Sequence, residues 1–106
     1  MSAPSPRLAL TKRAQRDVRA IEVYTLRTWG PEQALAYDAA IEKAFDVLRN
    51  QPRIGTVRDE IRLGLWSFPA ERHILYYRLT RGEIEILRIL HERADAMRQL
   101  GPRRSR

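Results

Sequence analysis

Two histidines are the side chains of this sequence best suited to acid–base chemistry. His73 and His91 lie in two separate apolar, strand-like segments, and Tyr76 follows the first of them. A histidine or tyrosine can move the proton of a ribose 2′-hydroxyl, and an arginine can neutralise the charge of the phosphorane that forms. Arg62 and Arg88 lie in the same part of the chain, so that Arg62, His73, Arg88 and His91 form a candidate phosphodiester-cleaving set.

A structural role for the histidines is the alternative. A histidine near the end of a strand commonly bonds to a backbone group or a carboxylate, and Glu71 and Glu92 are close in sequence. We expect no metal site, because two histidines without a suitably spaced carboxylate pair, in a chain with no cysteine, make a poor ligand set. The sequence has no Walker loop, GxGxxG or nucleophile-elbow motif, so no cofactor is expected.

Length and charge limit the organisation and the partners. The 106 residues allow one domain, which we place at residues 7–100, between a flexible N-terminus at 1–6 and a basic tail at 101–106. The net charge of +7 favours an acidic partner. There is no apolar signal segment at the N-terminus, no membrane-length apolar run and no cysteine, so we expect a cytoplasmic protein without a membrane partner.

Two helices must position these groups. Residues 7–11 are expected to form a strand, Lys12 to Trp29 a first helix, and Pro31 to Asn50 a second. The Gly30-Pro31 step suits the end of one helix and the start of the next, which makes an antiparallel hairpin. The buried stripes are expected at Ala14, Val18, Ile21, Thr25 and Thr28 of the first helix, and at Ala34, Tyr37, Ile41, Ala44, Phe45 and Leu48 of the second.

The second half of the chain is typical of a strand meander. Residues 61–68, 72–79 and 83–91 are predicted to be strands, joined by short turns, and residues 92–100 a short helix. The predicted fold is therefore α+β, with the hairpin packed on one face of a small, mostly antiparallel four-stranded sheet that includes the N-terminal strand.

The opposite sheet face is expected to be partly open and to carry polar side chains. Tyr76 and Tyr77 are adjacent, so one should be core and the other a surface candidate. The run from Ile84 to Leu90 is apolar on both faces and indicates a strand with cover on both sides. We expect Trp29 to fix the hairpin tip to the sheet. A basic domain with an open sheet face and a helical groove suits an acidic, amphipathic partner segment.

From about Leu8 to Met97 the sequence resembles the ParE branch of the ParE/RelE toxin superfamily. The order and spacing of several short motifs carry the resemblance: Leu10-Thr11 with Ala14, Asp17-Val18, Ile21 and Tyr24; Ala34 with Tyr37; Leu48 and the step from Pro52 to Gly55; residues 72–77; and residues 86–91 with Asp95.

The resemblance implies a bacterial type II toxin that is not an enzyme, poisons DNA gyrase by trapping its DNA-cleaved state, and is neutralised by a ParD-like antitoxin. DNA would be met only through gyrase or the antitoxin. RelE-like relatives are ribosome-dependent mRNA endonucleases that usually carry an aromatic acid–base residue near the C-terminus. The segment after His91 has no tyrosine, which favours the ParE branch.

The surface expected to bind the target combines the open sheet face with the basic C-terminus. Its members are Arg62, Arg72, Tyr76, Arg88, His91, Arg93, Arg98, Arg103 and Arg104. Two alternatives stay open: an mRNA endonuclease that uses the set around the two histidines, and a degenerate toxin that only binds an antitoxin.

Overall fold

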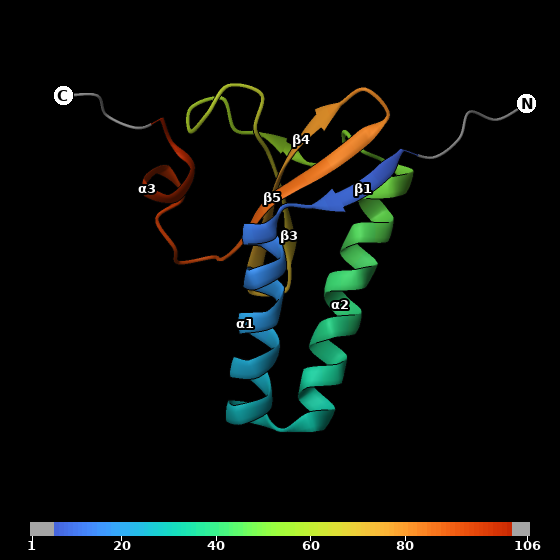
Figure 1. Cartoon of the computed structure of the whole chain (residues 1–106), viewed down its shortest axis with the longest axis vertical. Helices are drawn as coiled ribbons and strands as arrows, with labels where there is room; N and C mark the ends of the chain where they lie inside the picture. The colour runs from blue at the N-terminus through green and yellow to red at the C-terminus, as the bar shows by residue number, and fades with distance from the viewer. Residues whose placement is uncertain (1–5, 103–106) are drawn as a thin grey trace, which may run out of the picture.

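The computed structural model describes residues 6–102 and contains eight elements. In chain order they are β1 (Arg7–Leu10), α1 (Lys12–Trp29), α2 (Pro31–Asn50), β2 (Thr56–Val57), β3 (Trp66–Ala70), β4 (His73–Thr80), β5 (Glu83–His91) and α3 (Ala96–Leu100). Figure 1 shows α1 and α2 side by side as a hairpin, with its tip extending beyond the end of the sheet. The predicted α+β fold, with an antiparallel hairpin on a mostly antiparallel sheet and a short C-terminal helix, is confirmed.

Local sequence explains the hairpin. Thr11 caps α1, because its side chain accepts a hydrogen bond from the Ala14 N–H at 3.1 Å. Its hydroxyl also donates to the Leu87 carbonyl at 2.9 Å, which anchors the start of α1 to the sheet. Gly30 sits between the helices with φ of 93°, a conformation that favours glycine, and Pro31 occupies the first position of α2.

The sheet has five strands in the order β1-β5-β4-β3-β2. β1 runs parallel to β5, and the other neighbours are antiparallel. The prediction of four strands missed β2, which is only two residues long. The prediction that a strand begins at Ile61 was wrong: residues 58–65 form a turn in which the Asp59 carboxylate accepts from the Gly64 N–H, and β3 begins at Trp66. The last helix begins at Ala96, capped by Asp95, rather than at Glu92.

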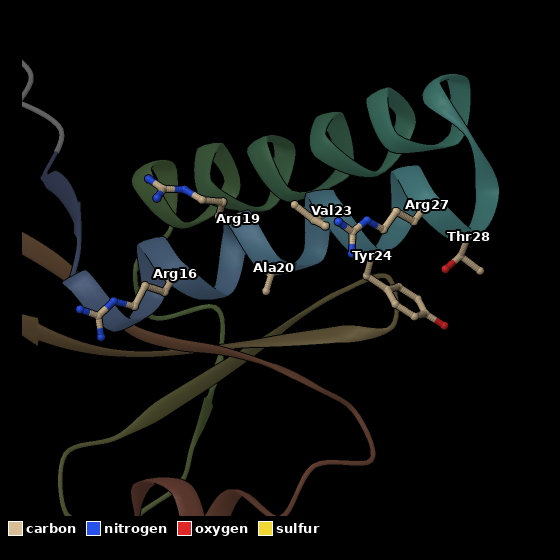
Figure 2. A pocket seen from close by; sticks show the side chains of 7 residues that line it. All are labelled: Arg16, Arg19, Ala20, Val23, Tyr24, Arg27 and Thr28. Atoms are coloured by element: carbon tan, nitrogen blue, oxygen red, sulfur yellow. The ribbon is translucent and has the colours of Figure 1, made fainter.

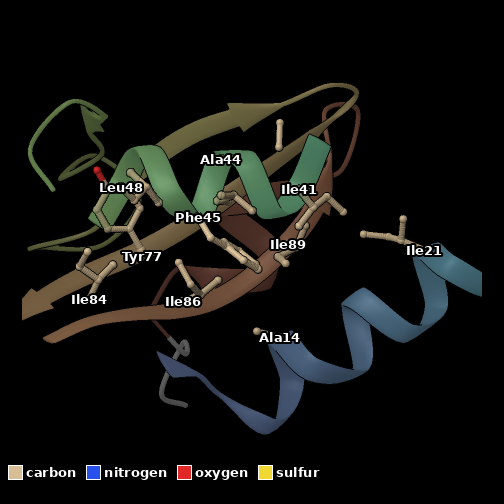
Figure 3. Packing of buried hydrophobic residues seen from close by; sticks show 12 residues of the cluster. Ala14, Ile21, Ile41, Ala44, Phe45, Leu48, Tyr77, Ile84, Ile86 and Ile89 are labelled. Atoms are coloured by element: carbon tan, nitrogen blue, oxygen red, sulfur yellow. The ribbon is translucent and has the colours of Figure 1, made fainter. Parts of the chain in front are cut away.

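The main core lies between the hairpin and the sheet (Figure 3). The stripe predicted on α2 is confirmed: Ile41, Ala44, Phe45 and Leu48 are buried, and Ala34 and Tyr37 are half-buried. On α1, Ala14, Ile21 and Thr25 are buried and Val18 is half-buried, whereas Thr28, predicted to join them, is exposed. The sheet contributes Leu75, Tyr77, Ile84, Ile86 and Ile89.

A second, smaller core covers part of the opposite sheet face. It joins Leu65 of the turn 58–65, Tyr76 of β4, Leu90 of β5 and Leu100 of α3. The expected open face is therefore partly closed, and both Tyr76 and Tyr77 are buried, so the prediction that one of them lies at the surface was wrong. The cover on both sides predicted for residues 84–90 is confirmed, because Ile84, Ile86 and Ile89 belong to the first core while Leu90 belongs to the second.

Candidate functional site

The two histidines lie side by side at one end of the sheet. His73 of β4 and His91 of β5 are paired across the strands, and their ring centroids are 5.3 Å apart with the rings nearly perpendicular. Side chains alternate along β4, so His73 lies on the same face as Leu75 and Tyr77, the face that the hairpin covers. The pairing register therefore brings together two groups that are 18 positions apart in sequence.

A tyrosine from the hairpin completes this cluster. The Tyr37 hydroxyl of α2 lies 2.5 Å from His73 Nδ1 and accepts a hydrogen bond from the Arg72 N–H at 3.1 Å. The hydroxyl oxygen accepts from the Arg72 N–H, and its O–H donates a hydrogen bond to Nδ1. The ring proton of a neutral His73 is then on Nε2. His91 Nδ1 accepts from the Arg93 N–H at 3.1 Å.

Burial and charge favour the neutral form of His73. Its removal from water lowers the pKa of His73, and the neighbouring His91 lowers it further, while Asp17 and Glu92 oppose this shift. Burial also raises the pKa of Tyr37, so that its hydroxyl stays protonated at neutral pH. Tyr37 and His73 thus form a hydrogen-bonded link between α2 and the sheet in which both side chains favour their neutral forms.

This state of His73 predicts a pH-dependent stability. The pKa of His73 is lower in the folded protein than its unfolded value of about 6.5. The stability that depends on neutral His73 is therefore fully present above pH of about 6.5 and is lost as the pH falls through the folded-state pKa. Urea unfolding at pH 8 and pH 5 should show a smaller stability loss on acidification for His73→Gln than for the original protein. A Gln33→Ala control, at an exposed position of α2, should keep the original loss. Equal losses for His73→Gln and the original protein would contradict this account.

A cleft of about 590 Å³ opens beside the cluster, between the hairpin and the end of the sheet. His73, His91, Glu71 and Arg72 line its polar side. Its other lining residues come from the helices: Tyr24, Thr25, Trp29, Gln33, Ala36, Tyr37 and Ala40. Trp29 is 68% exposed, so the expectation that it fixes the hairpin tip to the sheet was wrong.

The predicted four-residue nuclease set is not assembled. His73 and His91 face the hairpin, whereas Arg62 is exposed in the turn 58–65, whose Ile61 and Leu65 pack on the second core. Arg88 is bound to an aspartate of α1. The arginine that does lie with the histidines is Arg72, which also approaches Glu92 at 3.5 Å.

Arg88 instead belongs to a structural ion pair. Its guanidinium donates to both carboxylate oxygens of Asp17, at 2.7 and 3.1 Å, and to the side chain of Gln99 at 3.1 Å. The same carboxylate accepts from the Ile89 N–H at 2.9 Å. The side chains of Arg88 and Asp17 are only 14% and 16% exposed. One pair thus connects α1, β5 and the C-terminal helix.

The residues expected to bind the target fall into three groups. Arg62, Arg72, His91, Arg93 and Arg98 are exposed. Tyr76 is buried in the second core and Arg88 is largely buried with Asp17, so the expectation that these two lie on an open sheet face was wrong. Arg103 and Arg104 are outside the described residues.

A second hollow lies along the outer side of α1 and is not part of the predicted surface. We call it the α1 groove; it has a volume of about 600 Å³ and is lined by Arg16, Arg19, Ala20, Val23, Tyr24, Arg27 and Thr28 (Figure 2). Sequence reasoning missed this groove because the buried stripe of α1 accounted for the helix. The signal was a second stripe, with apolar residues at positions 20, 23 and 24.

No helix within residues 6–102 combines the length and apolar character needed to cross a membrane.

Comparison with known proteins identifies the family. Residues 8–96 match the family described as the ParE toxin of the type II toxin-antitoxin system parDE. A protein named toxin ParE1 from Mycobacterium tuberculosis is 39% identical over 97 residues, which cover 91% of this chain and 99% of that protein. Another toxin ParE1, from Caulobacter vibrioides, is 29% identical over 92 residues, covering 87% and 95% of the two chains.

Solved structures agree with these sequence relationships. A chain of the chromosomal ParDE toxin–antitoxin system from P. aeruginosa superimposes with a TM-score of 0.73 at 26% identity, covering 84% of this chain and 98% of that one. A chain of the toxin–antitoxin complex RelBE2 from Mycobacterium tuberculosis gives a TM-score of 0.57 at 28% identity, covering 82% and 98%. The chain therefore belongs to the ParE toxin family of type II toxin–antitoxin systems.

Proposed function

We propose that this chain poisons DNA gyrase by stabilising its DNA-cleaved state and is neutralised by a ParD-like antitoxin. The observation that supports this most strongly is the match of nearly the whole domain, residues 8–96, to ParE toxins. The solved relative from P. aeruginosa is part of a ParDE system, which supports an antitoxin as the partner. The protein would act in the bacterial cytoplasm and meet DNA only through gyrase or the antitoxin.

The proposed action is binding rather than catalysis. A ligand that prefers one state of its target raises the population of that state in proportion to its differential affinity. Inhibition therefore needs no acid–base group, and the separation of Arg62 and Arg88 from the histidines is consistent with this. The proposed target contacts are the exposed cations: Arg62, Arg72, His91, Arg93 and Arg98, with Arg103 and Arg104 of the tail.

The order in which macromolecular syntheses stop tests the proposal in cells. After induction of this chain, incorporation of labelled thymidine should fall before incorporation of labelled methionine, and a ParD-like protein encoded beside the gene should restore growth. Early loss of methionine incorporation, with cut mRNA that disappears in His91→Ala, would support the endonuclease instead. Unchanged growth on induction would support a degenerate toxin that only binds an antitoxin.

Charge reversal at the C-terminal cations should remove the effect on growth. The double variant Arg93→Glu/Arg98→Glu should bind gyrase about a hundredfold more weakly, because like charges brought together at an interface cost several kcal/mol. Both side chains are exposed, so thermal unfolding should be little changed. The matched control is Lys43→Glu, an exposed cation of α2. Full growth arrest by the double variant would exclude these two residues from the target surface.

A further inference from the structure

We propose that the cleft beside the two histidines binds a nucleoside monophosphate, with the phosphate at the sheet end and the base at the hairpin tip. The cleft opens where the hairpin extends beyond the end of the sheet (Figure 1), so that the two helices form one wall and the strand ends form the other. Its volume of about 590 Å³ lies within the range of roughly 300–1,000 Å³ that small-molecule sites occupy. The inference goes beyond the proposed function and does not depend on gyrase or an antitoxin.

Hydrogen bonds fix the ring protons of both histidines. Nδ1 of His73 accepts from the Tyr37 hydroxyl, and Nδ1 of His91 accepts from the Arg93 N–H. The proton of each neutral imidazole is therefore on Nε2. Neither Nε2 has a hydrogen-bond partner within residues 6–102, and no buried side-chain nitrogen of that range lacks one, so the Nε2 of half-buried His73 is accessible to solvent. The two Nε2–H groups are therefore available as donors to a ligand.

Arg72 adds a positive charge to these donors. Its guanidinium approaches Glu92 at 3.5 Å, and both side chains are exposed, so this pair is weak and its geometry is easily exchanged. A guanidinium binds two oxygens of a phosphate at once. One guanidinium and two neutral imidazoles match the charge of a monophosphate better than the larger negative charge of a triphosphate. The sheet end of the cleft therefore favours a single phosphate group.

The helical wall of the cleft is aromatic. Trp29 and Tyr24 of α1 line it and are 68% and 65% exposed. A nucleobase that stacks on these rings removes apolar surface on both sides from water, and every base has a face for such stacking. Ala36 and Ala40 of α2 line the same wall, and their small side chains leave room for a planar ring. The hairpin tip therefore favours an aromatic ligand group.

Glu71 is held at the cleft in a strained backbone conformation. Its φ is 56°, which makes it the one non-glycine residue with a positive φ within residues 6–102. It begins the two-residue turn that follows Ala70 and precedes His73, where glycine would be favoured. Its carboxylate lines the cleft and is an acceptor among donors. In a nucleotide, the sugar hydroxyls lie between phosphate and base, and we assign Glu71 to them.

An aromatic carboxylate, such as a side chain and C-terminus of a peptide, fits the cleft less well. It would occupy the donors of Arg72 and the histidines and would stack on Trp29. It has no hydroxyl groups for Glu71, whose carboxylate would repel it. A nucleotide satisfies the donors, the aromatic wall and the acceptor together.

Isothermal titration calorimetry with adenosine monophosphate tests the site on the full chain. Adenosine and inorganic phosphate each supply part of the contacts and should bind at least about tenfold more weakly. Arg72→Gln, His91→Gln and Trp29→Ala should each weaken binding of the monophosphate by about tenfold. The matched controls are Arg62→Gln, at an exposed cation of the turn 58–65, and Leu35→Ala, at an exposed apolar position of α2; both should bind as the original protein does. Circular dichroism verifies that each variant is folded.

Glu71→Gly separates a binding role from a structural one. Glycine adopts a φ of 56° without strain, so the thermal stability of the variant should be little changed. The original protein should bind adenosine monophosphate about fivefold or more tightly than its 2′-deoxy form, because the carboxylate accepts from the sugar hydroxyls. Glu71→Gly should lose this discrimination, which a residue that only shapes the turn would not change.

Four results would overturn the proposal. The first is no binding of adenosine monophosphate at millimolar concentration by the folded protein, and the second is equal binding by Arg72→Gln and Arg62→Gln. The third is binding of N-acetyltryptophan as tight as that of the nucleotide, which would assign the cleft to a peptide carboxylate. The fourth is binding of a ten-base single-stranded DNA more than about a hundredfold tighter than the nucleotide, which would assign it to a nucleic-acid strand. These measurements are made without gyrase or growth assays, so their failure and the failure of the proposed function are distinguishable.

Discussion

Asp17→Ala is expected to lower the free energy of unfolding by about 3–5 kcal/mol. Asp17 accepts two hydrogen bonds from Arg88 and one from the Ile89 N–H. Its loss leaves a largely buried guanidinium without a counter-charge, and breaking such a pair typically costs this much. The affected contacts connect α1 to β5, so the whole domain should respond in urea or thermal unfolding.

An exposed pair on α2 provides the matched control. Arg49 and Asp46 lie 2.6 Å apart with exposed fractions of 39% and 67%. Asp46→Ala should cost less than about 1 kcal/mol, because solvent screens such pairs. The double variant Asp17→Leu/Arg88→Met, which removes both charges, should recover much of the stability lost in Asp17→Ala. Similar losses for Asp17→Ala and Asp46→Ala would show that the Arg88 pair does not hold the fold together.

Tyr76→Ala is expected to lower the free energy of unfolding by about 3 kcal/mol or more. Tyr76 is 6% exposed and packs with Leu65, Leu90 and Leu100 in the second core. Removal of a buried aromatic side chain loses its transfer free energy and leaves a cavity beneath the turn 58–65 and α3. Urea unfolding monitored by tryptophan fluorescence measures this loss.

The same position distinguishes a core residue from a target contact. Tyr76→Phe keeps the ring and should keep both stability and growth arrest. If Tyr76 contacted the target through its hydroxyl, Tyr76→Phe would fold normally but lose growth arrest, and Tyr76 would have to be counted among the target contacts. Burial also raises the pKa of Tyr76, so the hydroxyl is neutral in the folded protein.

Periodicity predicted the hairpin correctly because its signals are local. The stripe on α2 and the Gly30-Pro31 step depend on residues within a few turns of one another. The closure of the second sheet face depends on long-range packing of Leu65 and Leu100 onto β4 and β5. The alternation between Ile61 and Leu65 is typical of a strand, yet in the structure these residues pack from a turn onto the second face.

A register irregularity in β5 interrupts the alternation of faces that the sequence suggests. Tyr76 pairs with Arg88, whereas Tyr77 pairs with Ile86, so Leu87 is the extra residue of a bulge in β5. A single extra residue moves every later side chain to the opposite face, and no local pattern in the sequence marks its place. Arg88 still pairs with Tyr76, as expected of two residues on one face, but Asp17 of α1 binds its guanidinium and takes it out of the predicted basic surface.

The sequence pointed to the histidines of the candidate site, but it did not show which residues would lie together there. His73 and His91 were expected to matter, but their contact requires the pairing register of β4 and β5, and Tyr37 joins them from α2, 36 positions away from His73. The α1 groove consists of neighbours along a single helix and was predictable from the second stripe of that helix.

The measurement that tests gyrase poisoning most directly is a plasmid cleavage assay. Purified protein is incubated with DNA gyrase, ATP and supercoiled plasmid, and the reaction is stopped with detergent and protease. The account predicts linear plasmid whose amount rises with the concentration of the protein and falls in the Arg93→Glu/Arg98→Glu variant, with the Lys43→Glu control unchanged. Plasmid that stays uncut at every protein concentration, while the same preparation arrests growth, would contradict it.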